Sequence, residues 1–249
     1  MDDLALAASL VRDAGLLAAR MLSGGLSTSY KSSVSDVVSA ADHAAEALIA
    51  SRLRTARPGD GLVGEEGAAA PGRRTWFVDP VDGTYNFLSG LPFWCCALAL
   101  TDPAGLVLGA VYQPVTNELW LGGRDHVTTW NETPVPALVD QALSQVSLAT
   151  YLHPAALADD SVRIPLLRVI EGAATVRMLG SGSIELASIA SGRLGAWAQV
   201  NALDWDWLPG VALVRAAGGA TEVFEAHGHP WHIAGSRQAV AEIVELLRA

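Results

Sequence analysis

Apolar residues recur at helical spacing near the start of the chain, among alanines. Large apolar side chains follow one another four or seven positions apart: Leu6, Leu10, Leu17 and Met21. This spacing predicts a packed helix over residues 2–22. A second stripe with the same period predicts a helix over residues 42–54. The Ser/Gly-rich stretch between them, SGGLSTSYKSSVSD, is typical of a loop or a short hairpin.

Beyond residue 60 the pattern changes to short apolar runs separated by turn residues. These runs predict an antiparallel meander with strands at 62–64, 75–78, 93–101, 106–112 and 118–121. After a Pro/Asp-containing segment, strands predicted at 146–150, 174–178, 195–200 and 220–224 alternate with helices predicted at 160–171, 183–191, 207–217 and 236–248. Helices and mixed strands in both halves predict a layered α/β sandwich. Without an internal repeat or long linker, residues 1–249 are expected to form one domain with approximate halves 1–140 and 141–249.

Composition and charge narrow the function classes. The chain has 249 residues, 51% of them hydrophobic, and a formal net charge of -10. This charge argues against nucleic acid or an anionic membrane as the main partner. An acidic protein that binds an anionic substrate needs local positive charge, and a bound metal ion can supply it.

Three sequence features predict a cytoplasmic protein. The N-terminal stretch MDDLALAASLVRDAG carries acidic residues where a signal peptide carries basic ones. No uninterrupted apolar run approaches the roughly 18 residues of a membrane span. Cys95 and Cys96 are adjacent in a predicted strand and so point to opposite faces, where they are not expected to bridge each other. Reduced thiols fit the cytoplasm.

Acidic residues stand where charge is unexpected, beside apolar segments. Asp79 and Asp82 end the apolar run of WFVDPVDGTYNF, and Glu65 and Glu66 follow another. Asp206 lies between two tryptophans at the start of a predicted helix. Because Mg²⁺ takes oxygen ligands and completes its shell with water and substrate phosphate, converging carboxylates of this kind are typical of a magnesium site.

Each feature also has a structural interpretation. The DPVDGT stretch is compatible with a simple turn, Asp42 and Asp206 with helix N-caps, and Glu65–Glu66 with a solvated pair. The histidines of HGHPWH, at 227–232, are read as a surface turn in preference to a metal site. Trp120 and Trp130 are read as exposed residues of a dimer contact.

Segments spread along the chain, several of them acidic, resemble the signature segments of the inositol monophosphatase family. The segments that carry the resemblance are KSSVSDVVSAAD at 31–42, GEE at 64–66, DPVDGTYNF at 79–87, GSGS at 180–183 and WDWLPGVALVRAAGG at 205–219. The resemblance covers nearly the whole chain. It implies that family's αβαβα layered sandwich, a homodimer, and Mg²⁺-dependent hydrolysis of inositol 1-phosphate or a similar small polyol phosphate by metal-activated water.

The same resemblance implies a set of site residues. Two to three Mg²⁺ ions would be held by Glu65, Asp79, the Val81 carbonyl, Asp82 and Asp206. The attacking water would be oriented or deprotonated by Thr84 with Asp42, while Glu65 serves the weakly bound third ion. Lys31 would lie near the phosphate end, with Asp36 as a supporting acid on the same loop. Substrate contacts would come from Asp82, Gly83, Thr84, Gly180, Ser181, Gln199 and Asp206.

Departures from the family pattern leave the substrate open. Gln199 stands seven positions before the WD aspartate, where many members carry an acid that contacts a substrate hydroxyl or amine. Histidinol phosphate stays an alternative because RPGDGLVGEE, at 57–66, is similar to that branch of the family, although Gln199 argues against a cationic substrate. Fructose 1,6-bisphosphate and nucleotide phosphates are further candidates. A regulatory, non-catalytic binding protein is the alternative from a different class. Trp207, Leu208 and Ala216 also depart from the pattern and are expected to affect packing more than chemistry.

Overall fold

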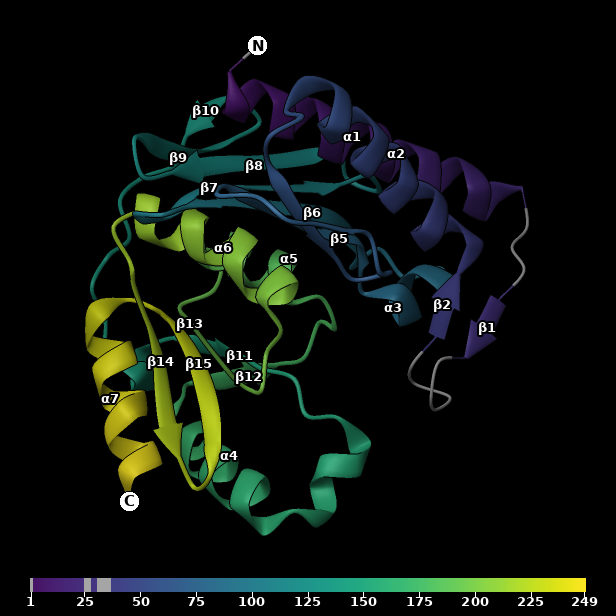
Figure 1. Cartoon of the computed structure of the whole chain (residues 1–249). Helices are drawn as coiled ribbons and strands as arrows, with labels where there is room; N and C mark the ends of the chain where they lie inside the picture. The colour runs from purple at the N-terminus through teal and green to yellow at the C-terminus, as the bar shows by residue number, and fades with distance from the viewer. Residues whose placement is uncertain (1, 25–27, 31–36) are drawn as a thin grey trace.

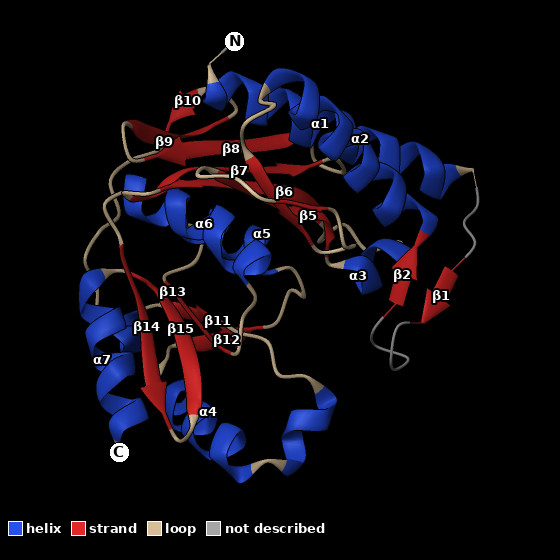
Figure 2. Ribbon diagram, in the orientation of Figure 1, coloured by secondary structure: helices blue, strands red, loops and turns tan. Residues whose placement is uncertain are grey.

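A computed structural model describes residues 2–24, 28–30 and 37–249 as stacked layers of helices and sheets (Figure 1). The outer pair is α1 (Asp3–Ser23) and α2 (Ala40–Ala56), which covers one face of a large sheet (Figure 2). Helices α5 (Gly182–Ala190) and α6 (Asp204–Ala216) lie between that sheet and a smaller one. Helices α4 (Asp160–Gly172) and α7 (Arg237–Arg248) form the last layer. The predicted αβαβα sandwich is confirmed.

The large sheet is mostly antiparallel, with strand order β10-β9-β8-β7-β6-β5-β3-β4. Its strands are β3 (Gly61–Gly64), β4 (Ala69–Ala70), β5 (Thr75–Asp82), β6 (Cys95–Asp102), β7 (Gly105–Gln113), β8 (Glu118–Gly123), β9 (His126–Trp130) and β10 (Thr133–Pro134). Only β3 and β5 pair in parallel within it. The short helix α3 (Thr84–Leu88) directly follows β5. The antiparallel meander is confirmed from β5 to β8, whereas the strand predicted at 62–64 pairs with β5 in parallel. The sequence pattern did not reveal β4, β9 and β10.

The small sheet has the order β12-β11-β13-β15-β14 and mixes parallel with antiparallel pairs. Its strands are β11 (Ser147–Ala149), β12 (Thr175–Arg177), β13 (Ala196–Val200), β14 (Ala220–Ala226) and β15 (His229–Gly235). Two short 3₁₀ helices flank β11, at Leu143–Gln145 and Pro154–Ala158. Near the N-terminus β1 (Thr28–Tyr30) and β2 (Val37–Ser39) pair as an antiparallel ribbon, as the hairpin interpretation predicted.

Four apolar cores are found among the described residues, and the smallest packs Val81, Phe87 and Trp94 against α1 and α2. Leu10 of α1 and Ile49 of α2 pack with Leu98 on one face of the large sheet. Residues of α5, α6 and the two facing sheets form the middle core, and those of α4 and α7 cover the outer face of the small sheet. Cys95 belongs to the middle core and Cys96 to the first, so they point to opposite faces as predicted, and both are free. Within the described residues no helix has the length and apolarity needed to cross a bilayer.

The expectation for the histidine-rich segment is wrong in part. His227 and Gly228 do form a turn, but it joins β14 to β15, and β15 lies in the interior of the sheet between β14 and β13. His232 is buried there, with its ring 5.2 Å from that of Trp207. Burial lowers the pKa of His232, so the neutral ring is favoured.

The expectation that the two tryptophans of the meander are exposed is also wrong. Trp120 is fully buried, and Trp130 is partly buried and stacked against it with ring centroids 6.3 Å apart. The Arg193 guanidinium lies 3.9 Å from the Trp130 ring centroid and forms an ion pair with Glu118. These rings are therefore covered by the chain itself, which removes the basis for placing a dimer contact on Trp120.

Candidate active site

Asp79 and Asp82 are brought to one side of β5 by an irregularity in the strand. In a regular strand, residues three apart point to opposite faces. Here Asp79 pairs with Ala97 and Asp82 with Cys95, so three steps along β5 match two along β6. One extra residue of this kind is a bulge, which re-aims the side chains that follow it. Pro80 lies inside the bulge. Proline has no N–H to donate to a neighbouring strand, and a bulge is a position in a sheet that tolerates this.

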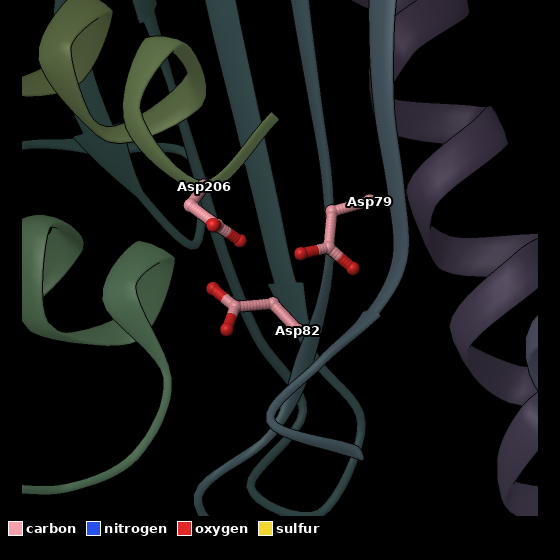
Figure 3. A group of neighbouring side chains, drawn as sticks. All are labelled: Asp79, Asp82 and Asp206. Carbon is pink, nitrogen blue, oxygen red and sulfur yellow. The ribbon is translucent and has the colours of Figure 1, made fainter. Parts of the chain in front are cut away.

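Asp206 reaches the same place from the other half of the chain. It lies in the first turn of α6, and the N-terminal end of α6 points toward the end of β5 (Figure 1). One carboxylate oxygen from each of Asp79, Asp82 and Asp206 lies within 4.8 Å of the others, and Figure 3 shows the three groups turned toward one another. Asp206 is therefore more than a helix cap, because its carboxylate faces two others.

The electrostatics of this cluster are unfavourable without a cation. Asp79 is 1% exposed and Asp82 is 6% exposed. Burial raises the pKa of Asp79 well above its usual range, and the charges of Glu65, Asp82 and Asp206 raise it further. Burial and the Asp82 charge likewise raise the pKa of Asp206 to about 7. Among the described residues, none donates a hydrogen bond to Asp79 Oδ1 although it is buried. A cation bound here would satisfy that oxygen and reverse the repulsion.

Glu65 adds a fourth carboxylate, held by the turn that follows β3. Its backbone N–H donates to the Val78 carbonyl at 3.1 Å, and its side chain lies beside the Asp79 carboxyl. The buried Glu46 accepts hydrogen bonds from the backbone N–H groups of Glu66 and Ala68, both at 2.8 Å, which fixes this turn. The Glu66 side chain is only 3% exposed, so Glu66 is not solvated, whereas Glu65 is partly exposed.

Asp82 is anchored by the start of α5. Its Oδ2 accepts a hydrogen bond from the Ser183 backbone N–H at 2.6 Å. Burial raises the pKa of Asp82, while the hydrogen bonds from Ser183 and Ser181 oppose that rise. This contact joins the large sheet to the second half of the chain at the site itself.

Thr84 links the strand end to the first half's helices. Its hydroxyl lies 3.3 Å from Oδ1 of the fully buried Asp42 and 3.1 Å from the Val81 carbonyl oxygen. Asp42 lies in the first turn of α2, which begins at Ala40, two residues before the start that the sequence predicted. Gly83 precedes α3 with φ of 94°, a conformation that favours glycine.

A cleft of about 790 Å³ opens over the cluster. Its lining includes most of the residues expected at the site, namely Glu65, Asp82, Gly83, Thr84, Gly180, Ser181, Gln199 and Asp206. Asp79 and Asp42 lie buried behind this wall. Lys31 and Asp36 fall outside the described residues.

The lining also contains residues that the sequence did not suggest: Tyr85, Asn86, Tyr151, Leu152, His153, Pro154, Gly182 and Glu185. Segment 151–154 follows β11 and lines the cleft. Aromatic residues directly after a predicted strand were the available signal for it. Glu185 was hidden because it lies in an otherwise apolar helix.

Comparison with known proteins gives a consistent result. Residues 2–246 match the model of the inositol monophosphatase family. An inositol-1-monophosphatase of Rhizobium meliloti is 34% identical over 78% of this chain and 75% of its own. One from Caulobacter vibrioides is 31% identical over 88% of this chain and 90% of its own. The Nus factor SuhB of Xylella fastidiosa is 31% identical over 74% of this chain and 68% of its own.

Solved structures show the same likeness in three dimensions. The extragenic suppressor protein suhB of Bartonella henselae superposes with a TM-score of 0.88 at 28% identity, covering 98% of this chain and 97% of the other. An IMPase of Thermotoga maritima superposes with a TM-score of 0.87 at 25% identity, covering 99% of this chain and 97% of the other.

Proposed function

The chain belongs to the inositol monophosphatase family and is a phosphatase, and from that premise we propose that it hydrolyses a small polyol phosphate with Mg²⁺, inositol 1-phosphate being the first candidate. The observation that carries the proposal is the convergence of Asp79, Asp82 and Asp206, of which Asp82 and Asp206 line the cleft.

The donor set fits a hard divalent cation. Every cluster ligand is a carboxylate oxygen, which is the ligand type that Mg²⁺ prefers. Asp79, Asp82 and Asp206, with Glu65 and the Val81 carbonyl, would hold two to three ions. When bound, such ions supply positive charge against the phosphate oxygens and the leaving oxygen, and make water a stronger nucleophile.

The chain's own groups would orient the attacking water. The Thr84 hydroxyl can donate its proton to Asp42 Oδ1, which leaves its lone pairs to accept a hydrogen bond from water. Asp42 would then receive, through Thr84, the proton that water loses as its oxygen attacks phosphorus. The ester oxygen leaves on the opposite side, so no covalent phospho-enzyme is required. The backbone N–H groups of Gly83 and Thr84 are proposed to bind the phosphate, and Lys31 to lie at its far side.

The other wall of the cleft would bind the organic part of the substrate. Gly180 and Ser181 supply backbone and hydroxyl groups, and Gln199 can both donate and accept a hydrogen bond. A neutral amide suits a polyol hydroxyl better than an ammonium group. This favours inositol phosphate over histidinol phosphate.

Asp82→Asn tests the proposal. Release of inorganic phosphate from inositol 1-phosphate should require Mg²⁺ in the wild type and should collapse in this variant. Asp204→Asn is a matched control, because Asp204 lies in the same turn as Asp206 but is exposed. Full Mg²⁺-dependent activity in Asp82→Asn would refute the mechanism.

Two alternatives are tested alongside. For histidinol phosphate, fructose 1,6-bisphosphate and nucleotide phosphates, kcat/KM measured beside that for inositol 1-phosphate ranks the substrates directly. A regulatory, non-catalytic role draws support from the relative named Nus factor SuhB. Calorimetry that detects no Mg²⁺ binding, together with no turnover of any substrate in the panel, would favour that role.

We also propose a cytoplasmic homodimer in which residues 1–249 form one domain. Two free, buried cysteines support a reducing compartment. The Ser183–Asp82 hydrogen bond crosses between the halves at the site, which supports a single folding unit. Light scattering on the purified protein measures the assembly state.

A further inference from the structure

A turn at residues 179–181 connects the two halves of the cleft. Gly180 and Ser181 line the cleft, and Ser181 is the N-cap of α5, whose Ser183 N–H donates a hydrogen bond to Asp82. The turn packs closely on the first half: a Cβ added at Gly83 would lie 3.0 Å from the Gly180 carbonyl oxygen. Any shift of the turn therefore changes both the cleft wall and the anchor of Asp82.

Glu185 holds this turn from one side. Its Oε1 accepts a hydrogen bond from the Leu179 N–H at 2.7 Å, and its Oε2 accepts one from Trp197 Nε1 at 2.8 Å. The residue is 1% exposed, so water does not replace these contacts. Both partners are obligatory donors, which means that only a group with two acceptor oxygens satisfies them.

Asn86 holds the same peptide segment from the other side. Its Nδ2 donates to the Leu179 carbonyl and to the Phe93 carbonyl, both at 2.7 Å. Leu179 is thus fixed through its N–H by the second half of the chain and through its C=O by the first. Gly180 then turns with φ of 80°, which brings Ser181 to the start of α5.

We propose that Glu185 is a positioning residue: with Asn86 it fixes the 179–181 turn, and through that turn the Ser183 N–H that orients Asp82 and the wall that binds the substrate. The expected change in KM rests on the proposed function, because it is measured with the proposed substrate. The expected change in the Mg²⁺ Kd does not. It assigns a role to a buried carboxylate that contacts none of the reacting atoms.

Glu185→Gln is the decisive variant, because its amide N–H must face either Leu179 N or Trp197 Nε1, donor against donor. The Mg²⁺ Kd measured by calorimetry should rise about tenfold, and kcat/KM for inositol 1-phosphate should fall about 10–100-fold with a rise in KM, the range found when groups supporting metal ligands are removed. Glu242→Gln is the matched control. Glu242 also accepts hydrogen bonds from a backbone N–H, of Leu143, and from a side-chain N–H, of Gln238, but it lies on α7 in the outer layer.

A purely structural role would lower the melting temperature and the fraction of folded enzyme without changing KM or the Mg²⁺ Kd. Unchanged values of both in folded Glu185→Gln would therefore overturn the inference. Asn86→Ala, at a half-buried site, loosens the same turn from the other side and should change both constants in the same direction. It decides the question if Glu185→Gln does not fold. If the wild type hydrolyses no substrate, the proposed function fails, and the Mg²⁺ Kd still tests the role of Glu185.

Discussion

The two ends of the cleft are built in opposite ways. At the acidic end, Asp79 and Asp82 are buried, carry only acceptor oxygens, and are fixed by a bulge and by the start of a helix. At the other end, Tyr151 is 38% exposed and lies in a segment without regular structure after β11; the partly buried Gln199 also lines the cleft.

This difference indicates a division of labour. A rigid, buried group of like charges is costly to the fold unless a cation binds, so its retention is best explained by chemistry. An exposed, neutral and aromatic wall adds little to the fold and can vary with the substrate. Changes at the acidic end should therefore affect every substrate, and changes at the other end should affect only some.

Asp79→Asn should produce the largest effect. Loss of a ligand shared between ions removes several kcal/mol of charge stabilisation, so kcat/KM should fall about 10³-fold or more for every phosphate ester. In EDTA the variant should nevertheless melt a few degrees higher than the wild type. The amide keeps the shape of Asp79, removes one buried charge, and can donate to neighbouring carboxylates. A lower melting temperature in EDTA would contradict the account of repulsion at this end.

The metal-free protein should lose stability as the pH rises. The pKa of Asp206 is raised to about 7 and that of Glu185 to about 8, in each case chiefly by burial. Between about pH 4 and these values the folded state binds more protons than the unfolded state, so stability falls with increasing pH. Urea unfolding in EDTA should show a loss on the order of 5 kcal/mol between pH 5.5 and 8.0, about 2 from Asp206 and about 3 from Glu185. Mg²⁺ binds the ionised aspartates and should remove the part of the loss that comes from Asp206. A loss as large with Mg²⁺ as without it would place its source away from the acidic end.

The acidic end could be predicted from the sequence because its residues lie in short, contiguous motifs beside apolar strands. The convergence of Asp79, Asp82 and Asp206 agrees with that expectation, while their roles as ligands stay a prediction. What the sequence could not show is the bulge, since the pairing partner of β5 decides where an extra residue fits. Pro80 was its only local sign.

Apolar periodicity predicted the layers of the fold. The features that it missed, β15 and the role of Glu185, have a common cause. β15 was read as a turn because His227, Gly228 and Pro230 are turn formers, yet its neighbours β13 and β14 supply hydrogen bonds along its length. Tertiary pairing thus overrode local propensity. Glu185 was missed for a related reason, since its partners Leu179 and Trp197 come from outside its helix.

At the substrate end, Gln199→Glu should change selectivity by about tenfold. A carboxylate there could pair with the ammonium group of histidinol phosphate, and a charge-assisted hydrogen bond is about twice as strong as a neutral one. We expect the ratio of kcat/KM for histidinol phosphate to that for inositol 1-phosphate to rise about tenfold, which corresponds to about 1.4 kcal/mol. Gln199→Met, neutral and similar in length, should not raise the ratio. If Gln199→Glu and Gln199→Met change this kcat/KM ratio to the same extent, Gln199 does not contact the organic part of the substrate.

Tyr151→Ala should have the smallest effect, and it separates the two ends most sharply. The Tyr151 ring packs edge-on against His153 with centroids 6.4 Å apart, and both rings line the cleft. An aromatic contact contributes about 0.5–1.5 kcal/mol, so kcat/KM for p-nitrophenyl phosphate should fall about threefold to tenfold. Inositol 1-phosphate has no ring for such a contact, and its kcat/KM should stay within about twofold, as should the Mg²⁺ Kd. An equal fall for both esters would mean that segment 151–154 supports the acidic end, and the division between the two ends would then be lost.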